Sequence, residues 1–225
     1  MFKRLDPYGN GSVGVYVRAT ATHLFVPPGL TEQNVADFEE AFSLPSIPLT
    51  LGGSTLLGSL MAANSHGALV ADCASDAEIA ILEDAGLNVQ RLQHARLNAT
   101  GNNILVNDHA ALAHPEMSKK TLALIEDTFG VPVAQRAIAD VPTVGTACVA
   151  TNKGFMAHPL ATEDDIAFLK DHFGVNGRIG TVNHGHGFVG AGMAANQTGV
   201  VTGTKTTGIE LGRIEEALGF LETET

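Results

Sequence analysis

The chain repeats a pattern about every 44 residues, and this repeat constrains its fold more than any other feature of the sequence. Three sets of positions keep the period: a glycine, a polar residue that opens a strand, and a residue that ends a helix. They are Gly14, Gly58, Gly101, Gly145 and Gly190; Thr20, Asn64, Asn107, Asn152 and Asn196; and Ser43, Gly86, Gly130, Gly174 and Gly219. A period of this length indicates an array of supersecondary units.

The fourth repeat shows the order of secondary-structure elements in one unit. Residues 143–150 are rich in β-formers and predict a strand, and an Asn- and Gly-containing turn joins them to a second short apolar run at 154–157. Thr162 is then expected to cap a helix whose first turn is acidic, and Gly174 to end it. Residues 175–181 lead into a third strand. Each unit is therefore strand, turn, strand, helix, strand.

The other repeats predict the same order of elements. Ser75 with Glu78, and Thr207 with Glu210, match the capping box of a helix N-terminus. A single unit cannot bury both its sheet and its helix, but five units can close into a ring. We therefore expect an α/β fold, a five-bladed propeller with pseudo-fivefold symmetry, with helices outside and short strands around the axis.

The length and composition fit one globular domain spanning residues 1–225. Hydrophobic residues make up 44% of the chain and charged residues 16%, which excludes a disordered protein. The first ten residues and the final GluThrGluThr are expected to be loose. The repeats are placed at approximately 11–53, 54–94, 95–140, 141–183 and 184–222.

The net charge and the cysteines limit the kinds of partner and the cellular compartment that we expect. A formal charge of −11 argues against binding free nucleic acid and favours a basic protein surface as partner. No stretch is long and apolar enough for a membrane span or a signal peptide, so a cytoplasmic location is expected. Cys73 and Cys148 are expected to be free thiols.

Five segments make the sequence similar to a known family. They are AlaAsnSerHisGlyAlaLeuVal at 63–70, LeuAsnAlaThrGlyAsnAsn at 97–103, AsnAspHisAlaAlaLeuAlaHisPro at 107–115, GlyThrValAsnHisGly at 180–185 and AlaGlyMetAlaAlaAsn at 191–196. In their order and spacing they resemble the translation initiation factor 6 family in its archaeal form. The resemblance covers essentially the whole chain.

The resemblance implies a fold and a function. It implies the five-repeat pentein ring, without a catalytic site, metal or cofactor, and a monomer. It implies binding to the large ribosomal subunit, which blocks association with the small subunit, and a role in late large-subunit biogenesis. The implied partner is ribosomal protein uL14, with the sarcin–ricin RNA loop nearby.

The glycine positions suggest where such a partner would bind. Because they are fivefold equivalent, they should lie at one level around one face of the ring. The neighbouring candidates for a ribosome-binding face are Ser12, Val13, Ser59, Asn102, Asn103, Thr146, Phe188 and Val189. Asn102 and Phe188 also match positions that the resemblance links to ribosome contact or release, and Phe188 would serve as an apolar anchor if exposed.

An enzymatic alternative remains within the same fold. Pentein hydrolases and amidinotransferases modify guanidines with a nucleophilic Cys near the C-terminus, a His and paired carboxylates. Here residues 149–225 contain no Cys, and neither Cys73 nor Cys148 lies in a Cys–His pattern. This alternative is therefore disfavoured.

The histidines raise a second alternative, a metal site. His184 and His186 could present two imidazoles on one strand face, with His109, His114 and His158 as companions. The glycine-rich sequence around the pair is more typical of a turn, and no carboxylate or Cys lies at metal-ligand spacing. We therefore expect no metal.

Overall fold

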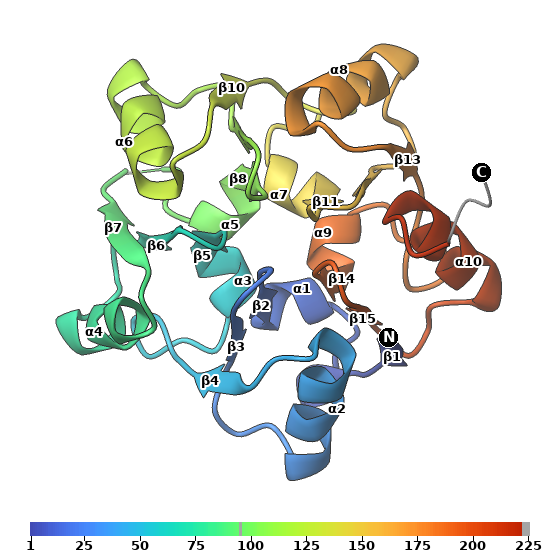
Figure 1. The fold of residues 1–225 in the computed structure, drawn as a ribbon, viewed down its shortest axis with the longest axis horizontal. Helices are drawn as coiled ribbons and strands as arrows, with labels where there is room; N and C mark the ends of the chain where they lie inside the picture. The colour runs from blue at the N-terminus through green and yellow to red at the C-terminus, as the bar shows by residue number, and fades with distance from the viewer. Residues whose placement is uncertain (95, 222–225) are drawn as a thin grey trace.

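Five three-stranded sheets are arranged around a central axis in the computed structural model, which describes residues 1–94 and 96–221 (Figure 1). In each sheet the first strand is antiparallel to the second and the second is parallel to the third. The first four sheets are each completed before the chain enters the next one. The five-bladed α/β ring expected from the repeat is confirmed, and so is the pentein fold that the resemblance implies.

Each blade contains a short inner helix, two strands, a longer outer helix and a closing strand. Blade 1 comprises α1 (Val13–Tyr16), β2 (Arg18–Ala19), β3 (Leu24–Val26), α2 (Glu32–Phe42) and β4 (Ser46–Pro48). Blade 2 comprises α3 (Leu57–Leu60), β5 (Met61–Ala63), β6 (Gly67–Ala71), α4 (Asp76–Asp84) and β7 (Asn88–Leu92). Blade 3 comprises α5 (Thr100–Asn103), β8 (Ile104–Val106), β9 (Ala111–Ala113), α6 (Lys119–Phe129) and β10 (Val133–Gln135).

The last two blades keep this order, except that the fifth takes its closing strand from the other end of the chain. Blade 4 comprises α7 (Val144–Ala147), β11 (Cys148–Ala150), β12 (Phe155–Ala157), α8 (Glu163–Phe173) and β13 (Gly177–Ile179). Blade 5 comprises α9 (Val189–Gly192), β14 (Met193–Ala195), β15 (Val200–Thr202), α10 (Gly208–Ala217) and β1 (Phe2–Arg4), and a short turn of 3-10 helix, η1 (Pro7–Gly9), leads from β1 into blade 1.

The outer helices begin and end where the sequence predicts. Thr162 and Thr207 accept hydrogen bonds from the first turns of α8 and α10, and both capping boxes predicted from sequence are present. The helix-ending positions all have positive φ, from 55° at Ser43 to 90° at Gly86. This left-handed conformation stops a helix with little strain when the residue is glycine.

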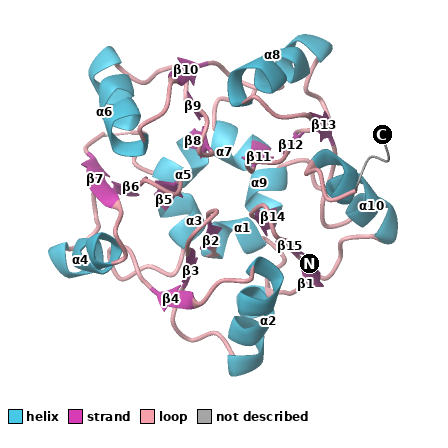
Figure 2. Ribbon diagram, viewed as in Figure 1, coloured by secondary structure: helices cyan, strands magenta, loops and turns pink. Residues whose placement is uncertain are grey.

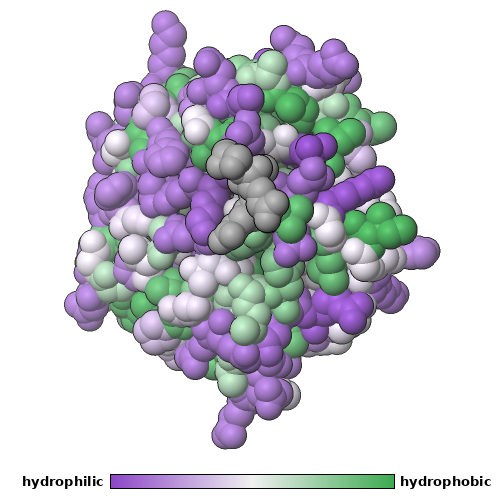
Figure 3. All heavy atoms as spheres, turned by 45° about the vertical axis from the view of Figure 1, so that its right-hand side comes forward, coloured by the Kyte–Doolittle hydropathy of each residue, from purple (hydrophilic) through white to green (hydrophobic). Residues whose placement is uncertain are grey.

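The core is divided among the blades. The outer helices pack their apolar faces between the sheet of their own blade and that of the preceding blade. Six phenylalanines of these helices and strands are fully buried: Phe25, Phe38, Phe42, Phe129, Phe155 and Phe173. The surface in Figure 3 is mainly hydrophilic, with hydrophobic residues in small groups. Among the described residues, every helix is too short or too polar to cross a lipid bilayer.

The residues around the axis differ from the expectation. The sequence predicts one strand over 143–150, but the structure has α7 followed by β11, and every blade likewise places a four-residue helix before its first strand. These inner helices surround the axis, while the longer helices lie at the rim (Figure 2). The expectation that helices lie outside is therefore right for the longer helices and wrong for these five short ones. Packing between neighbouring inner helices overrides the β propensity of residues such as Val144 and Thr146.

The N-terminus is also more ordered than expected. Phe2–Arg4 form β1, which pairs in parallel with β15 and completes the fifth sheet. The backbone N–H of Val200 donates to the carbonyl oxygen of Met1. The expectation that the first ten residues are loose is therefore wrong, because these residues close the ring. The final residues, 222–225, lie outside the described part of the chain.

The contribution of β1 can be measured through Phe2. Its ring packs edge-on against Phe220 at a centroid distance of 5.2 Å and joins the blade 5 core. Phe2→Ala should lower the free energy of unfolding by about 1.5 kcal/mol, because a partly buried aromatic contact is lost. Urea unfolding would measure the change, and Ile209→Ala, at a side chain 75% exposed, is the control. Equal effects of the two variants would contradict a closing role for β1.

Candidate binding face on the inner helices

The five inner helices form a closed ring. Each contains one of the glycines that recur about every 44 residues, which we call the ladder glycines, and each ladder glycine lies against the backbone of the preceding blade. Gly58 contacts the carbonyl oxygen of Gly14, Gly101 that of Gly58, Gly145 that of Gly101, Gly190 that of Gly145, and Gly14 that of Gly190. A Cβ atom at any of these positions would lie far inside van der Waals contact with that oxygen. The glycine period therefore records the close approach of backbones that closes the ring.

The exposed side of this ring is made by two positions in each blade. The residue two before the ladder glycine and the residue one after it are three apart, so they lie on the same side of a helix. In α7 these are Thr143 and Thr146, whose hydroxyl oxygens are 2.9 Å apart. We call the surface formed by these positions the inner-helix face: Ser12, Val15, Leu56, Ser59, Ala99, Asn102, Thr143, Thr146, Phe188 and Ala191, all partly or largely exposed.

The structure brings the sequence-predicted residues together on the inner helices but divides them by exposure. Five of them lie on the inner-helix face: Ser12, Ser59, Asn102, Thr146 and Phe188. Val13, Asn103 and Val189 are buried in the ring. Asn103 donates from Nδ2 to the carbonyl oxygen of Ala99, and its own carbonyl accepts from the N–H of His114. These three residues support the face from below.

Phe188 is the largest apolar side chain on the face, and its position is well supported. It is 39% exposed, and its ring packs against His158 and His186 at centroid distances of 5.4 and 5.7 Å. Burial, and to a lesser extent the neighbouring His186, lowers the pKa of His158. A neutral His158 favours this packing, so Phe188 is held at the surface in a defined orientation.

Leu56 is a second apolar residue on the face, and the sequence analysis missed it. It precedes Gly58 by two residues as Phe188 precedes Gly190, and it is also 39% exposed. The signal was available in the repeat, because the position two before each ladder glycine contains Ser12, Leu56, Ala99, Thr143 or Phe188. The face thus presents two large apolar side chains in equivalent places on blades 2 and 5.

The loops that lead into the inner helices are held by carboxylates of the outer helices. Glu78 of α4 caps its own helix and also accepts hydrogen bonds from the backbone N–H groups of Gly52 and Gly53 and from the Thr50 hydroxyl, at 2.6 to 3.0 Å. Glu210 of α10 likewise binds the loop before α9. The capping role was predicted from sequence, but the second role in fixing these loops was not.

In blade 4 a carboxylate also caps the outer helix and holds the loop, but it belongs to an aspartate instead of a glutamate. Asp165 caps α8, accepts from the backbone N–H of Ala139 and pairs with Arg136 at 2.7 Å. The turn it holds has positive φ at both Ala139 and Asp140, as a two-residue type I′ turn requires. Three inter-blade loops around the face are therefore pinned in place.

These hydrogen bonds shift the acidity of the carboxyl groups. Burial raises the pKa of Glu78, but hydrogen bonds from Thr50, Ser75, Gly53 and Gly52 outweigh it and lower the pKa to about 2. The same balance lowers the pKa of Glu210 to about 2. Both groups are therefore ionised at neutral pH, and their charge is satisfied within the protein.

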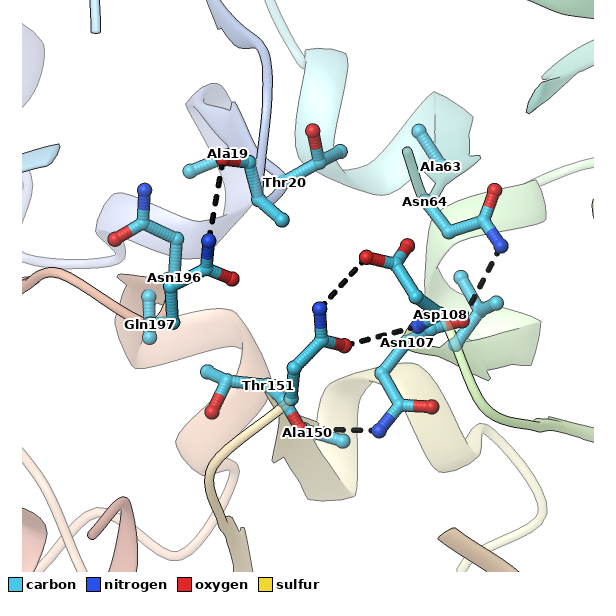
Figure 4. A pocket seen from close by; sticks show the side chains of 14 residues that line it. Ala19, Thr20, Ala63, Asn64, Asn107, Asp108, Ala150, Thr151, Asn196 and Gln197 are labelled. Carbon is cyan, nitrogen blue, oxygen red and sulfur yellow. Dashed lines mark hydrogen bonds between the residues drawn. The ribbon is translucent and has the colours of Figure 1, made fainter. Parts of the chain in front are cut away.

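The repeating polar residues, which we call the polar ladder, lie together at the hairpin turns, further along the axis than the inner helices (Figure 4). Asn64 donates from Nδ2 to the carbonyl oxygen of Asn107, and Asn107 donates to that of Thr151, while each side-chain oxygen closes its own turn. These positions follow the first strand of each blade, so they lie in the turn between the strands. Around them is a cavity of about 30 Å³, lined by all five blades.

The fourth member of this ladder was assigned incorrectly from sequence. The Thr151 hydroxyl accepts from the N–H groups of Lys153 and Gly154, as the Asn64 side chain does in its turn, so Thr151 and not Asn152 is the equivalent residue. Asn152 instead bridges to Asp108, donating from Nδ2 at 2.6 Å. Adjacent polar residues made the two registers indistinguishable in the sequence.

The thiols are poorly placed for the guanidine chemistry considered above. Both cysteines are free, and burial raises the pKa of Cys148 to about 12, so its thiolate is scarce at neutral pH. Cys73 is exposed at a turn beside Gly52, away from the axis. Along the described lining of the cavity in Figure 4, Asp108 is the one carboxylate. A nucleophile with paired carboxylates is not assembled there.

The histidine pair lies in a loop. His184 and His186 belong to the turn between Val182 and α9, which is bridged to itself and has positive φ at His184. The described residues contain no group of three His, Cys, Asp or Glu side chains placed to hold a metal ion. The strand-face arrangement that would present both imidazoles to one ion does not form.

Comparisons with known proteins agree on one family. The family model described as the eIF-6 family matches residues 2–217. A protein named translation initiation factor 6 from Natronomonas pharaonis is 46% identical over 215 residues, covering 95% of this chain and 97% of its own length. Proteins of the same name from Methanocella arvoryzae and Methanosarcina mazei are 46% and 41% identical, each covering 99% of this chain and 100% of its own length.

Proposed function

The chain belongs to the eIF-6 family of translation initiation factors, and from this premise we propose that it binds the large ribosomal subunit and prevents association with the small one. The three relatives named above match it over nearly their full length and are archaeal proteins named translation initiation factor 6. The proposal further gives it a role in late large-subunit biogenesis, as a factor that must leave before the subunit becomes active.

The inner-helix face is the surface proposed to contact the subunit. The observation that carries this assignment is the pair of equivalent exposed residues, Phe188 and Leu56, on loops pinned by buried carboxylates. A preformed face loses little conformational entropy on binding, which favours affinity. Small polar residues next to the ladder glycines, such as Asn102 and Thr146, lie on the same face and allow a partner to approach closely.

The proposed mechanism is occlusion and requires no chemistry. The ring is held together through the backbone contacts of five blades, so it can act as a rigid block between two subunits. A high pKa of the buried thiol supports a non-enzymatic role. The proposal includes a monomer that acts in the cytoplasm, as the family resemblance implies.

The charge of the chain supports a protein partner. With 24 acidic and 13 basic residues, the surface favours a basic ribosomal protein over exposed RNA. Ribosomal protein uL14 is the proposed partner, with the sarcin–ricin RNA loop nearby. Association should slow as ionic strength rises, because long-range attraction between the two proteins is screened.

Phe188 provides the test of the proposed face. Phe188→Ala should weaken binding to isolated large subunits about tenfold, because it removes an exposed aromatic anchor worth roughly 1.4 kcal/mol. Binding would be measured by co-sedimentation over a range of protein concentrations. The control is Leu160→Ala, at a side chain that is 75% exposed but lies outside the inner-helix face.

Thermal unfolding of both variants separates binding from folding. Phe188→Ala should keep a melting temperature close to that of the parent, since the side chain is only partly buried. If its affinity equals that of Leu160→Ala and of the parent, the inner-helix face is not the contact surface.

A further inference from the structure

A second small cavity lies on the axis, next to the one in Figure 4, and a single arginine reaches into it. Its volume is about 30 Å³, and residues of all five blades line it, including Val17, Ile104, Cys148 and Met193. Arg18 of β2 is the one charged residue in this lining. The site lies at the level of the inner strands, below the inner-helix face.

The guanidinium of Arg18 is enclosed by the ring but almost unpaired. Its Nη2 donates to the carbonyl oxygen of Gly58 at 2.6 Å and lies beside Gly101. Its Nε is completely covered and has no hydrogen-bond partner in the described structure. One protein acceptor thus serves a group with five N–H donors. Buried polar groups that lack protein partners are usually satisfied by a bound ion or by water.

The charge of Arg18 is likewise uncompensated. Among the described residues, each carboxylate ion pair involves another cation: Lys3, Arg91, Arg96, Arg136 or Arg178. Burial lowers the pKa of Arg18 to about 10, so the group stays positively charged at neutral pH. An isolated buried charge is costly unless a counter-ion is present.

The carboxylate in the lining of the neighbouring axial cavity is already engaged. Asp108 lines the neighbouring cavity, and it accepts hydrogen bonds from the backbone N–H and the hydroxyl of Ser65 and from Nδ2 of Asn152, at 2.6 to 2.8 Å. Its charge is therefore stabilised by these three donors. The positive charge of Arg18, whose side chain is half-buried, therefore faces this small axial space without a carboxylate partner.

We infer that the axial cavity beside Arg18 binds a monovalent halide ion, with chloride as the physiological ligand. The volume of about 30 Å³ suits one small spherical ion and is too small for a nucleotide. The guanidinium supplies both the charge and the N–H donors that such an anion requires. The ion completes the interior of the ring and stabilises its closure.

Thermal unfolding in different potassium salts tests this inference. When gluconate is replaced by chloride or bromide at constant ionic strength, the melting temperature of the intact protein should rise by about 3 °C, because the ion binds the folded state alone. Arg18→Met should lose this response. Arg178→Met, which removes an exposed arginine paired with Glu216, should keep it. A halide response retained in Arg18→Met would overturn the inference.

Crystals of the unaltered protein grown or soaked in bromide give an independent answer, which does not depend on the variant folding. An anomalous peak beside the Arg18 guanidinium is the expected result. Ordered water at that place in bromide, with no anomalous signal, would show that the arginine is solvated and would overturn the inference. Neither experiment involves the ribosome, so its outcome is separate from that of the proposed function.

Discussion

Gly145→Ala is expected to destabilise the protein by about 3 kcal/mol or more. Its Cβ would collide with the carbonyl oxygen of Gly101, a backbone atom that cannot rotate away. The carbonyl oxygen of Ile104 blocks the same space at 2.7 Å. Relief requires neighbouring blades to separate, and that separation is opposed by every other contact around the closed ring.

Urea unfolding followed by circular dichroism would measure this effect. We propose that residues 1–225 unfold as one domain, so a single transition should move to lower urea concentration. Gly212→Ala is the matched control, because Gly212 lies within α10 and a Cβ there meets nothing within 4 Å. That variant should gain about 0.5 to 1 kcal/mol from better helix propensity. Similar midpoints for the two variants would refute the role assigned to the glycine ladder.

Glu78→Gln is expected to cost about 3 kcal/mol at neutral pH. The folded protein lowers the pKa of Glu78 from an ordinary value of 4.5 to about 2, which corresponds to roughly 3 kcal/mol of preferential stabilisation of the carboxylate. A glutamine keeps the shape but has one acceptor oxygen in place of two, so its N–H₂ group faces the N–H donor of either Gly52 or Gly53, which bind different oxygens of Glu78. The control is Glu83→Gln on the exposed side of the same helix.

The effect should depend on pH in a defined direction. Because the folded pKa is depressed, the stabilisation by Glu78 is fully present above pH 4.5 and is lost as the pH falls towards 2. The difference in unfolding free energy between the parent and Glu78→Gln should therefore shrink between about pH 5 and pH 2. A difference that stays constant over this range would show that the charge of Glu78 is not the stabilising feature.

The sequence predicts much of this architecture because the repeating positions contain residues that favour one backbone conformation. Glycine at the ladder positions, Gly86 or Gly174 at helix ends and capping boxes such as Ser75 with Glu78 each have one favoured backbone setting. Repeated five times, these local signals determine the number of blades and the place of the outer helices. The candidate face follows from the same period.

Other features depend on contacts that no local signal records. The inner helices have only four residues, too short to be stable alone, and they form because they pack against equivalents in the adjacent blades. Strand β1 pairs with β15 across almost the whole length of the chain. The exposure of Phe188 and Leu56, and the isolation of Arg18 on the axis, arise only after the ring has closed.

The central claim, that this ring keeps ribosomal subunits apart, is tested most directly by co-sedimentation with isolated ribosomal subunits. Purified protein would be mixed with large subunits, small subunits or both, and the pelleted complexes compared. We predict that the protein pellets with large subunits and not with small ones, and that the fraction of joined subunits falls as it is added. Protein that stays in the supernatant at all salt concentrations, or that binds while joining continues unchanged, would contradict the account.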